Sequence, residues 1–434
     1  MSRATIVALV VVWTSEVCPA VLMHSTATLS QARADLAAAT VGSKALFAGG
    51  RVGWNTYSNV VDIYDADTQS WSTAALSQAR ACLSGASVGS KVLFAGGRVD
   101  WDTYSNVVDI YDADTQSWST AALSQARGCL AAASVGNKVF FAGGVPGGYA
   151  YSDVVDIYDA ETGQWSTATL SRARGCLSAT SVGTMAIFAG GTNTVDIYDV
   201  SSAQWSVAEL SQARGSLAAA TAGNKALFAG GYPDSSVVDV YDSSTGQWSV
   251  QELLDPRTNL AGASQGDNAF FAGGKDSSGY WLLLADCNND WFVGQGDLGI
   301  VLSQWGRSGS AITDERADNN GDGFVGQTDL NTVLAAWGQS ILHLDWATVD
   351  IYNDATGLWS TDTLSQARHS LAGTAVDNMV LFAGGQRFSG YSNAVDIYTI
   401  PGNGSVAAPE PATIMLLGTG AALVALRRRH PNNR

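Results

Sequence analysis

One segment returns seven times along the chain and constrains the fold more than any other feature. Its second copy, residues 91–119, consists of KVLFAGG, a polar loop, VVDIYD, a turn and WS. The first three intervals between copies are 47 residues long, the next two are 40 and 43, and the last is 111. A period of about 40–50 residues is typical of architectures built from stacked units. The paired glycines that mark the copies are Gly49–Gly50, Gly96–Gly97, Gly143–Gly144, Gly190–Gly191, Gly230–Gly231, Gly273–Gly274 and Gly384–Gly385.

Each copy contains four expected strands. In the second copy they cover residues 82–88, residues 91–94, residues 107–111 and a stretch that begins at Trp118. The first of these is rich in small residues, which suit the crowded axis of a radial arrangement of sheets. Four strands at this period predict the blade of a β-propeller, so we expect an all-β protein.

The aromatic residues fix the register of the repeat. A tyrosine precedes a tryptophan by seven residues in six copies, at Tyr64/Trp71, Tyr111/Trp118, Tyr158/Trp165, Tyr198/Trp205, Tyr241/Trp248 and Tyr352/Trp359. With the paired glycines, this pattern resembles the kelch family over residues 25–281 and 345–399. The resemblance implies a seven-bladed kelch-type β-propeller. It implies no activity, because kelch domains act as binding platforms, structural modules and occasional enzymes.

The last copy lacks an outer strand. No tryptophan follows Tyr398, whereas Ser25–Leu29 near the N-terminus resembles Ser166–Leu170 of the third copy. We therefore expect the N-terminal segment to supply the fourth strand of blade seven and so close the ring. His24 takes the tryptophan position in this strand.

The interval of 111 residues holds an insertion of about 65 residues between the second and third strands of blade six. It contains a duplication, residues 286–306 and 318–338. Each copy has oxygen-bearing side chains at positions 1, 3, 5 and 12 and a backbone carbonyl at position 7, which predicts a Ca²⁺ loop. The expected ligands are Asp286, Asn288, Asp290, Phe292 and Asp297 in the first loop, and Asp318, Asn320, Asp322, Phe324 and Asp329 in the second.

A short amphipathic helix is expected after each loop, with Leu298, Val301, Leu302 and Trp305 on one face of the first. A tandem of calcium loops and helices resembles the dockerin family over residues 285–340, which implies Ca²⁺ and, in some relatives, a cohesin partner. The second loop keeps glycine at its sixth position, where the first has Trp291, so we expect the second to bind more reliably. A metal-free turn is the alternative for both.

The two ends predict export. An apolar run follows Arg3, as in a secretory signal, although a first buried strand is the alternative. Pro409–Pro411, an apolar stretch over residues 414–426 and three arginines resemble the PEP-CTERM sorting signal of Gram-negative bacteria. That resemblance implies processing by an exosortase, transient membrane anchoring, and delivery to the cell surface or the exopolysaccharide matrix. A plain tail anchor is the alternative.

These features divide the chain into six parts. They are a signal peptide (1–23), a kelch propeller up to the first part of blade six (24–281), a dockerin-like insertion (282–344), the rest of blades six and seven (345–400), a linker (401–408) and the sorting signal (409–434).

Charge and side-chain chemistry exclude several functions. With 23 basic and 39 acidic residues the net charge is −16, which argues against nucleic acid as a partner. The four histidines do not cluster, so we expect no enzyme. Cys82, Cys129 and Cys176 share one register, and we interpret them as small buried residues rather than as a disulfide or metal set.

The loops on one face of the ring are the expected binding surface. Each blade contributes an arginine there, and the long loops carry aromatics. The candidate ligand residues are Trp54, Tyr57, Trp101, Tyr104, Arg80 and Arg127. Alternatively, each arginine braces its own blade and the aromatics cover loop backbone. We expect a non-catalytic, calcium-assisted binding or scaffold protein that recognises a glycan or a protein. The alternative is a component of an extracellular polysaccharide-degrading assembly, attached through the dockerin-like module to a cohesin-like protein.

Overall fold

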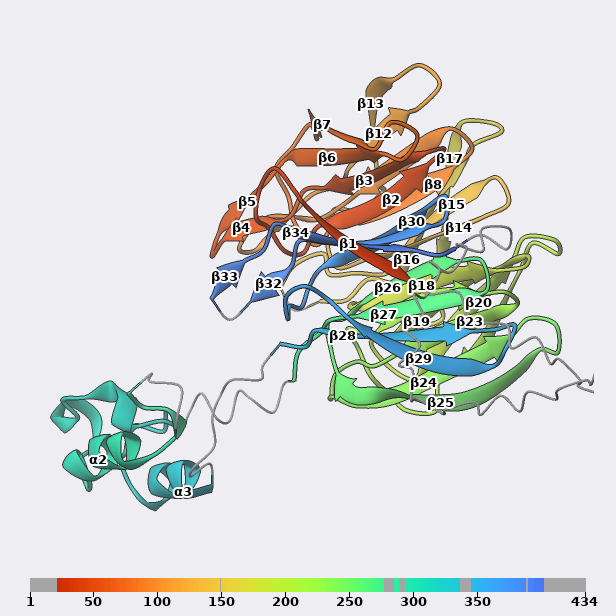
Figure 1. Cartoon of the computed structure of the whole chain (residues 1–434). Helices are drawn as coiled ribbons and strands as arrows, with labels where there is room; N and C mark the ends of the chain where they lie inside the picture. The colour runs from red at the N-terminus through yellow and green to blue at the C-terminus, as the bar shows by residue number, and fades with distance from the viewer. Residues whose placement is uncertain are drawn as a thin grey trace, which may run out of the picture. The chain divides into compact units, whose positions relative to one another are not determined.

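The computed structural model describes residues 22–148, 150–276, 285–288, 293–335, 345–387 and 389–401. These residues form seven four-stranded antiparallel sheets, the blades of a β-propeller (Figure 1). The innermost strands contact one another in a closed cycle, β2 to β8, β14, β18, β22, β26, β30 and back to β2. The predicted signal peptide up to Val21, the linker from Gly402 and the sorting signal lie outside the described residues.

In blades one to six the strands run outward in chain order, whereas the outermost strand of blade seven is β1 (Met23–Thr28). Blades one to four contain β2 (Ala37–Val41), β3 (Lys44–Ala48), β6 (Val60–Asp65) and β7 (Ser70–Ala75); β8 (Ser84–Val88), β9 (Lys91–Ala95), β12 (Val107–Asp112) and β13 (Ser117–Ala122); β14 (Ala131–Val135), β15 (Lys138–Ala142), β16 (Val154–Asp159) and β17 (Gln164–Thr169); and β18 (Leu177–Val182), β19 (Met185–Gly190), β20 (Thr194–Asp199) and β21 (Gln204–Glu209).

The remaining blades follow the same plan. They contain β22 (Ala218–Ala222), β23 (Lys225–Ala229), β24 (Ser235–Asp242) and β25 (Gln247–Arg257); β26 (Ala261–Gln265), β27 (Asn268–Ala272), β28 (Thr348–Asn353) and β29 (Leu358–Thr363); and β30 (Ala372–Val376), β31 (Met379–Ala383), β34 (Ala394–Thr399) and β1 (Met23–Thr28). Short hairpins extend three blades: β4 (Arg51–Gly53) with β5 (Thr56–Tyr57), β10 (Arg98–Asp100) with β11 (Thr103–Tyr104), and β32 (Gln386–Arg387) with β33 (Gly390–Tyr391).

The repeated aromatics face each other across two strands. Tyr111 of β12 pairs with Trp118 of β13, and the ring centroids lie 5.2 Å apart. Tyr111 and Trp118 pack into an apolar cluster with Phe94 of their own blade and Ala39 and Leu46 of blade one. Because Tyr111 and Trp118 are partners across the β12–β13 hairpin, the seven-residue spacing reflects their cross-strand pairing. This pairing places both rings between blades.

The paired glycines connect neighbouring blades. Gly49 and Gly50 have φ of 66° and 114°, a region that residues with a Cβ rarely adopt. The N–H of Gly50 donates to the carbonyl of Arg80 in the next blade at 2.9 Å, and a Cβ on Gly49 would lie 2.6 Å from that same oxygen. Glycine is thus required by the close approach of two backbones.

Strand β1 lies in the same sheet as the last blade. It pairs antiparallel with β34, in a register that runs from Met23 opposite Thr399 to Thr28 opposite Ala394. His24 stands opposite Tyr398, where the other blades have tryptophan, and its ring stacks on the tyrosine at 4.5 Å. The His24 ring nitrogen also lies 2.7 Å from Asp396 Oδ1.

Between β27 and β28 the described residues include two α-helices, α2 (Gln295–Ser303) and α3 (Gln327–Ala335), and two 3-10 turns, η1 (Gly309–Ala311) and η2 (Glu315–Ala317). A small apolar core holds them together; it contains Ala285, Cys287, Val293, Val301, Ala317, Val325 and Val333. The predicted helix face is partly wrong, because Leu302 and Trp305 point away from this core and are exposed. Among the described residues no helix combines the length and apolarity needed to cross a bilayer.

Candidate functional sites

Two exposed tryptophans stand side by side at the tips of neighbouring hairpins. Trp54 lies in the β4–β5 turn and Trp101 in the β10–β11 turn, with 79% and 58% of their surfaces exposed. Their rings stack with centroids 5.8 Å apart and planes inclined by 18°. We call this pair the tryptophan platform. Adjacent exposed aromatic side chains on a folded protein mark a binding site more often than single scattered apolar residues do.

Polar contacts hold the tryptophan platform in place. The Asn55 amide donates to Asp100 Oδ1 at 2.6 Å and so joins the two hairpins, and the Tyr57 hydroxyl donates to Asn55 Oδ1 at 3.1 Å. Arg98 lies over the Trp101 ring, 4.9 Å from its centroid, and its Nε donates to the Trp101 carbonyl at 2.9 Å. These contacts hold two otherwise independent loop tips in one orientation, which lowers the entropy lost when a ligand binds.

Tyr57 and Tyr104 lie lower in the same hairpins and are half-buried. Burial raises the pKa of both phenols, and nearby Arg98 opposes that rise. They support the platform rather than forming its exposed surface. Tyr151 is exposed on the neighbouring blade, while two other aromatics of the long loops, Tyr149 and Phe388, lie outside the described residues.

Arg80 and Arg127 do not belong to an exposed ligand face, so that prediction is wrong. Both side chains are fully buried. Arg80 Nη2 lies 2.5 Å from Asp109 Oδ2 and donates to the Phe94 carbonyl, and Arg127 makes the equivalent contact with Asp156 at 2.6 Å. The physical reason is that the arginine folds inward, under the linker between blades, to reach a carboxylate on the third strand of its own blade.

The same ion pair recurs in every blade. The pairs are Arg33–Asp62, Arg80–Asp109, Arg127–Asp156, Arg174–Asp196, Arg214–Asp239, Arg257–Asp350 and Arg368–Asp396, at 2.5–2.7 Å. The aspartate is the third residue of the VVDIYD segment. The sequence could have predicted these pairs, because an arginine and an aspartate recur in each copy of the repeat. The alternative interpretation, that each arginine braces its own blade, is therefore the one the geometry supports.

The second candidate calcium loop is ordered by its own hydrogen bonds. Asp318 accepts from the N–H groups of Asp322 and Gly323, at 3.1 and 2.9 Å. Asp329 is buried at the start of α3 and accepts from Gly326 N–H at 2.8 Å. The Asn320 amide donates to Asp322 Oδ2 at 2.9 Å. The carboxylates at positions 1 and 12 therefore have fixed orientations, and each oxygen keeps a further lone pair for a cation.

The first loop repeats part of this arrangement. Asp297 is buried at the start of α2 and accepts from Gly294 N–H at 2.8 Å and from Asn288 N–H at 3.0 Å. Asp286 is also buried. The predicted ligands Asp290 and Phe292 lie outside the described residues. In the described part of the chain, no group of three or more His, Cys, Asp or Glu side chains gathers closely enough to hold a metal ion.

The candidate metal ligands of the second loop also include an amide oxygen and a backbone carbonyl oxygen. A group defined only by His, Cys, Asp and Glu side chains does not count these two. Asn320 and the Phe324 backbone supply these oxygens, in the mixture of charged and neutral donors that Ca²⁺ takes. Gly323 has φ of 83°, the turn that position 6 requires. The residues of this loop thus fit Ca²⁺ in chemistry and backbone shape.

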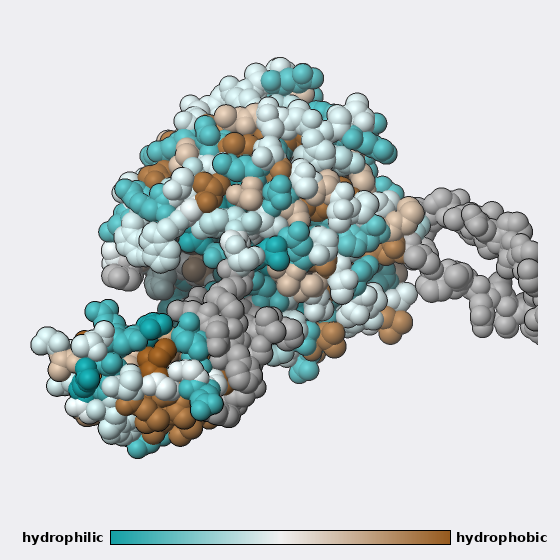
Figure 2. Space-filling view, turned by 60° about the vertical axis from the view of Figure 1, so that its left-hand side comes forward, coloured by the Kyte–Doolittle hydropathy of each residue, from teal (hydrophilic) through white to brown (hydrophobic). Residues whose placement is uncertain are grey.

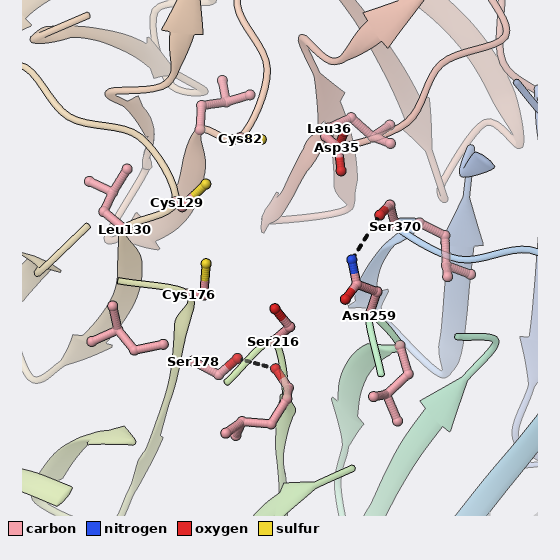
Figure 3. A pocket seen from close by; sticks show the side chains of 15 residues that line it. Asp35, Leu36, Cys82, Cys129, Leu130, Cys176, Ser178, Ser216, Asn259 and Ser370 are labelled. Carbon is pink, nitrogen blue, oxygen red and sulfur yellow. Dashed lines mark hydrogen bonds between the residues drawn. The ribbon is translucent and has the colours of Figure 1, made fainter. Parts of the chain in front are cut away.

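A ring of seven residues surrounds one end of the propeller axis. These residues stand just before the innermost strands and all have φ of 51–56°: Asp35, Cys82, Cys129, Cys176, Ser216, Asn259 and Ser370. Each N–H donates to the carbonyl of its predecessor at 2.9–3.3 Å, and Asp35 donates to Ser370, so the hydrogen bonds form a closed cycle. We call these residues the axial ring; they line a cavity of about 240 Å³ (Figure 3).

The sequence suggested that the three cysteines of the axial ring are small buried residues, and this interpretation is wrong. Cys82 and Cys129 are half-buried and Cys176 is exposed, and their side chains turn toward the axial cavity (Figure 3). The expectation failed because residue 82 was assigned to the innermost strand, whereas β8 begins at Ser84 and the cysteine occupies a left-handed turn.

Comparisons with known proteins agree with the repeat and with the C-terminal signal. Residues 35–231 match the KLHDC2/KLHL20/DRC7 Kelch-repeats domain, and residues 407–429 match the PEP-CTERM protein-sorting motif. No curated protein matched the chain. The predicted kelch repeats, the seven-bladed propeller and the sorting motif are thereby confirmed. The two matches do not reach the insertion, so its resemblance to dockerins stays a prediction.

The sorting motif also gives the destination. It is the motif of proteins that are exported and sorted at the cell envelope of Gram-negative bacteria, where exosortase recognises it. Kelch propellers typically serve as non-enzymatic interaction scaffolds. The site that carries the function is therefore expected on an exposed face of an exported ring.

Proposed function

We propose that this exported kelch-repeat propeller is a non-catalytic binding protein of the cell surface or exopolysaccharide matrix, and that its tryptophan platform binds sugar rings. The observation that carries the proposal is the pair of stacked, exposed indoles of Trp54 and Trp101. Sugar rings present C–H faces that pack on aromatic surfaces, and tryptophan supplies a large contact area with few rotatable bonds.

The polar groups beside the platform suit the same ligand. Asn55 and Asp100 adjoin Trp54 and Trp101 in the two hairpin tips, and they carry amide and carboxylate groups that can exchange hydrogen bonds with hydroxyls. The net charge of −16 favours a neutral or cation-bridged polysaccharide over a strongly anionic one. A protein partner is the alternative, and the experiment below distinguishes the two.

The direct test is a glycan array probed with the full exported chain and with the W54A/W101A double variant. Y232A is a matched control, because Tyr232 is an exposed aromatic, 60% accessible, in a blade-five loop. We expect the native chain and Y232A to bind the same glycans and the double variant to bind none. If the native chain binds no glycan while the variants fold normally, the proposal fails and a protein partner takes its place.

We infer further that the insertion binds Ca²⁺. Asp318, Asn320, Asp322, Asp329 and the carbonyl of Phe324 would hold the ion in the second loop. The hydrogen bonds that orient Asp318 and Asp329 support this assignment. When bound, the ion would cross-link the loop to α3 and neutralise its carboxylates. The first loop, with Asp286, Asn288 and Asp297, would bind more weakly because Trp291 stands at its sixth position.

We also infer that the N-terminal strand is the closing element of the ring. Two contacts support this: the pairing of β1 with β34, and the N–H of Leu29, just after β1, which donates to the carbonyl of Asn393 in blade seven at 2.8 Å. Without β1, the outer edge of blade seven would expose unpaired backbone groups.

A second function is favoured by one feature of the insertion. Leu302 of α2 and Leu334 of α3 occupy equivalent positions and are 52% and 49% exposed, and apolar residues reach the surface of the helical part in Figure 2. Such a pair suits docking on a cohesin-like protein and thereby membership of a polysaccharide-degrading assembly. Surface plasmon resonance against a cohesin domain tests this, since binding that survives L302D/L334D would rule out these residues as the contact.

A further inference from the structure

Three thiols meet at the axial cavity. Cys82, Cys129 and Cys176 are consecutive members of the axial ring, contributed by blades two, three and four, and we call them the thiol triad. Figure 3 shows their side chains directed toward the axial cavity, with Cys129 between Cys82 and Cys176. All three are free thiols in the structure. Ser216, Asn259, Ser370 and Asp35 complete the ring, so the triad is its only run of sulfur-bearing residues.

The backbone hydrogen bonds limit how far apart the triad residues can be. Cys129 N donates to Cys82 O at 2.9 Å and Cys176 N donates to Cys129 O at 3.3 Å. Adding the Cα–N bond and the O-to-Cα span sets upper limits of about 6.8 and 7.2 Å on the two Cα–Cα separations, and real bond angles shorten both. Disulfides join Cα atoms about 4.4–6.8 Å apart. The limit for Cys82–Cys129 coincides with the top of this range, and the limit for Cys129–Cys176 lies about 0.4 Å above it before the bond angles shorten the separation, so both neighbours stand close enough to Cys129 for a disulfide.

We propose that the thiol triad is a redox-reactive site at which Cys129 forms a disulfide with a neighbouring triad cysteine after reaction with a low-molecular-weight disulfide. The inference is independent of glycan binding, because the platform and the triad share no residue. An exported protein meets the oxidising conditions in which disulfides form and persist.

The chemistry proceeds in two exchange steps. The Cys176 thiolate attacks one sulfur of the small disulfide RSSR, which forms a Cys176–SR mixed disulfide and releases one RSH. The Cys129 thiol then loses its proton and its thiolate attacks Cys176 Sγ, which forms the Cys129–Cys176 bond and releases RS⁻, and RS⁻ takes up that proton as the second RSH. Two cysteine thiols are oxidised, one disulfide is reduced to two thiols, and both thiol protons leave on RSH. Exchange with Cys82 at Cys129 Sγ can move the bond to the Cys82–Cys129 pair.

The environments of Cys176 and Cys129 favour this order. Cys176 is the exposed member, and hydrogen bonding from Cys129, aided by Ser216, lowers its pKa to about 7 against the effect of burial. Hydrogen bonds with the thiols of Cys176 and Cys82, together with burial, raise the pKa of Cys129 well above its ordinary value. The thiolate is the nucleophile in exchange, so Cys176 reacts first and Cys129 resolves.

The test is peptide mapping of the full chain after treatment with oxidised glutathione under native conditions, followed by alkylation and trypsin digestion. Each triad cysteine lies in its own tryptic peptide, at residues 81–91, 128–138 and 175–214. We expect cross-links only between peptide 128–138 and one of the other two. The C129S variant should give no internal cross-link and should accumulate glutathione on Cys176.

The variants keep the result interpretable. C129S should fold, because Ser216 and Ser370 occupy equivalent ring positions with φ of 52° and 53°. C287S removes the buried thiol of the insertion and should change nothing. A stable glutathione adduct on Cys176 of the native chain, three unmodified triad thiols, or a cross-link between peptides 81–91 and 175–214 in C129S would each overturn the proposal.

Discussion

Removing one partner of a buried ion pair should unfold the ring at a much lower denaturant concentration. The change we consider is D156A in blade three. Arg127 and Asp156 are both buried, their charged atoms lie 2.6 Å apart, and Arg127 also donates to the Phe141 carbonyl at 2.9 Å. D156A leaves the guanidinium charge buried without its counter-charge, a loss of about 3–5 kcal/mol in folding free energy.

The lost acceptor adds to this effect. Asp156 Oδ1 accepts from Ser124 N–H at 2.8 Å in the linker that follows blade two, so D156A also frees a backbone donor, at a cost of about 1–3 kcal/mol if no water replaces it. The double variant R127M/D156L should lose less than the sum of the single variants, because two apolar side chains leave no unpaired charge.

Urea unfolding followed by tryptophan fluorescence measures the effect. The matched control is K138M, which removes the half-exposed Lys138–Asp159 pair of the same blade and should hardly move the midpoint. If D156A and K138M unfold at the same urea concentration, the buried pair does not stabilise the blade and the reasoning is refuted.

Three further predictions concern the insertion, the closing strand and acid. Calorimetric titration with Ca²⁺ should show binding that D318N abolishes and D286N leaves largely intact; absence of heat in the native chain would contradict the calcium assignment. Deleting residues 23–28 should lower the urea midpoint and promote association through the exposed edge of β34, seen by light scattering, and an unchanged monomer would argue against closure by β1. Burial tends to raise the pKa of Asp396, but the charge of Arg368 and hydrogen bonds lower it overall. The stability that this pairing contributes is therefore present above the ordinary carboxyl pKa and lost as pH falls through the folded value, so the midpoints of the native chain and D396N should converge below pH of about 4, and a gap that persists in acid would contradict this.

The sequence predicted the blades well because the repeat carries its own register. The Tyr111–Trp118 spacing corresponds to a cross-strand pair, and Gly49–Gly50 marks a close contact between blades. Both patterns recur from copy to copy of the repeat because the same backbone geometry recurs from blade to blade. The proposed closure by the N-terminal strand rests on the same kind of signal, since its sequence copies the outer strand of another blade.

The side-chain sites were harder to predict because they depend on where the chain turns. Arg80 follows a polar linker and looks exposed, but its partner Asp109 lies 29 residues further on, within an apolar strand. Cys82 has φ of 53°, a conformation that the sequence does not indicate for cysteine, so the convergence of three thiols was missed. Trp54 and Trp101 were predicted as ligand residues, but their mutual stacking depends on the angle between adjacent blades.

The measurement that bears most directly on the proposed function is calorimetric titration of the full exported chain with oligosaccharides cut from the exopolysaccharide of its host. We predict saturable binding that Y232A leaves unchanged and W54A/W101A weakens by at least about 30-fold, as expected when a contact of about 2 kcal/mol or more is removed. Equal affinity of the native chain and W54A/W101A would contradict the assignment of glycan binding to the tryptophan platform.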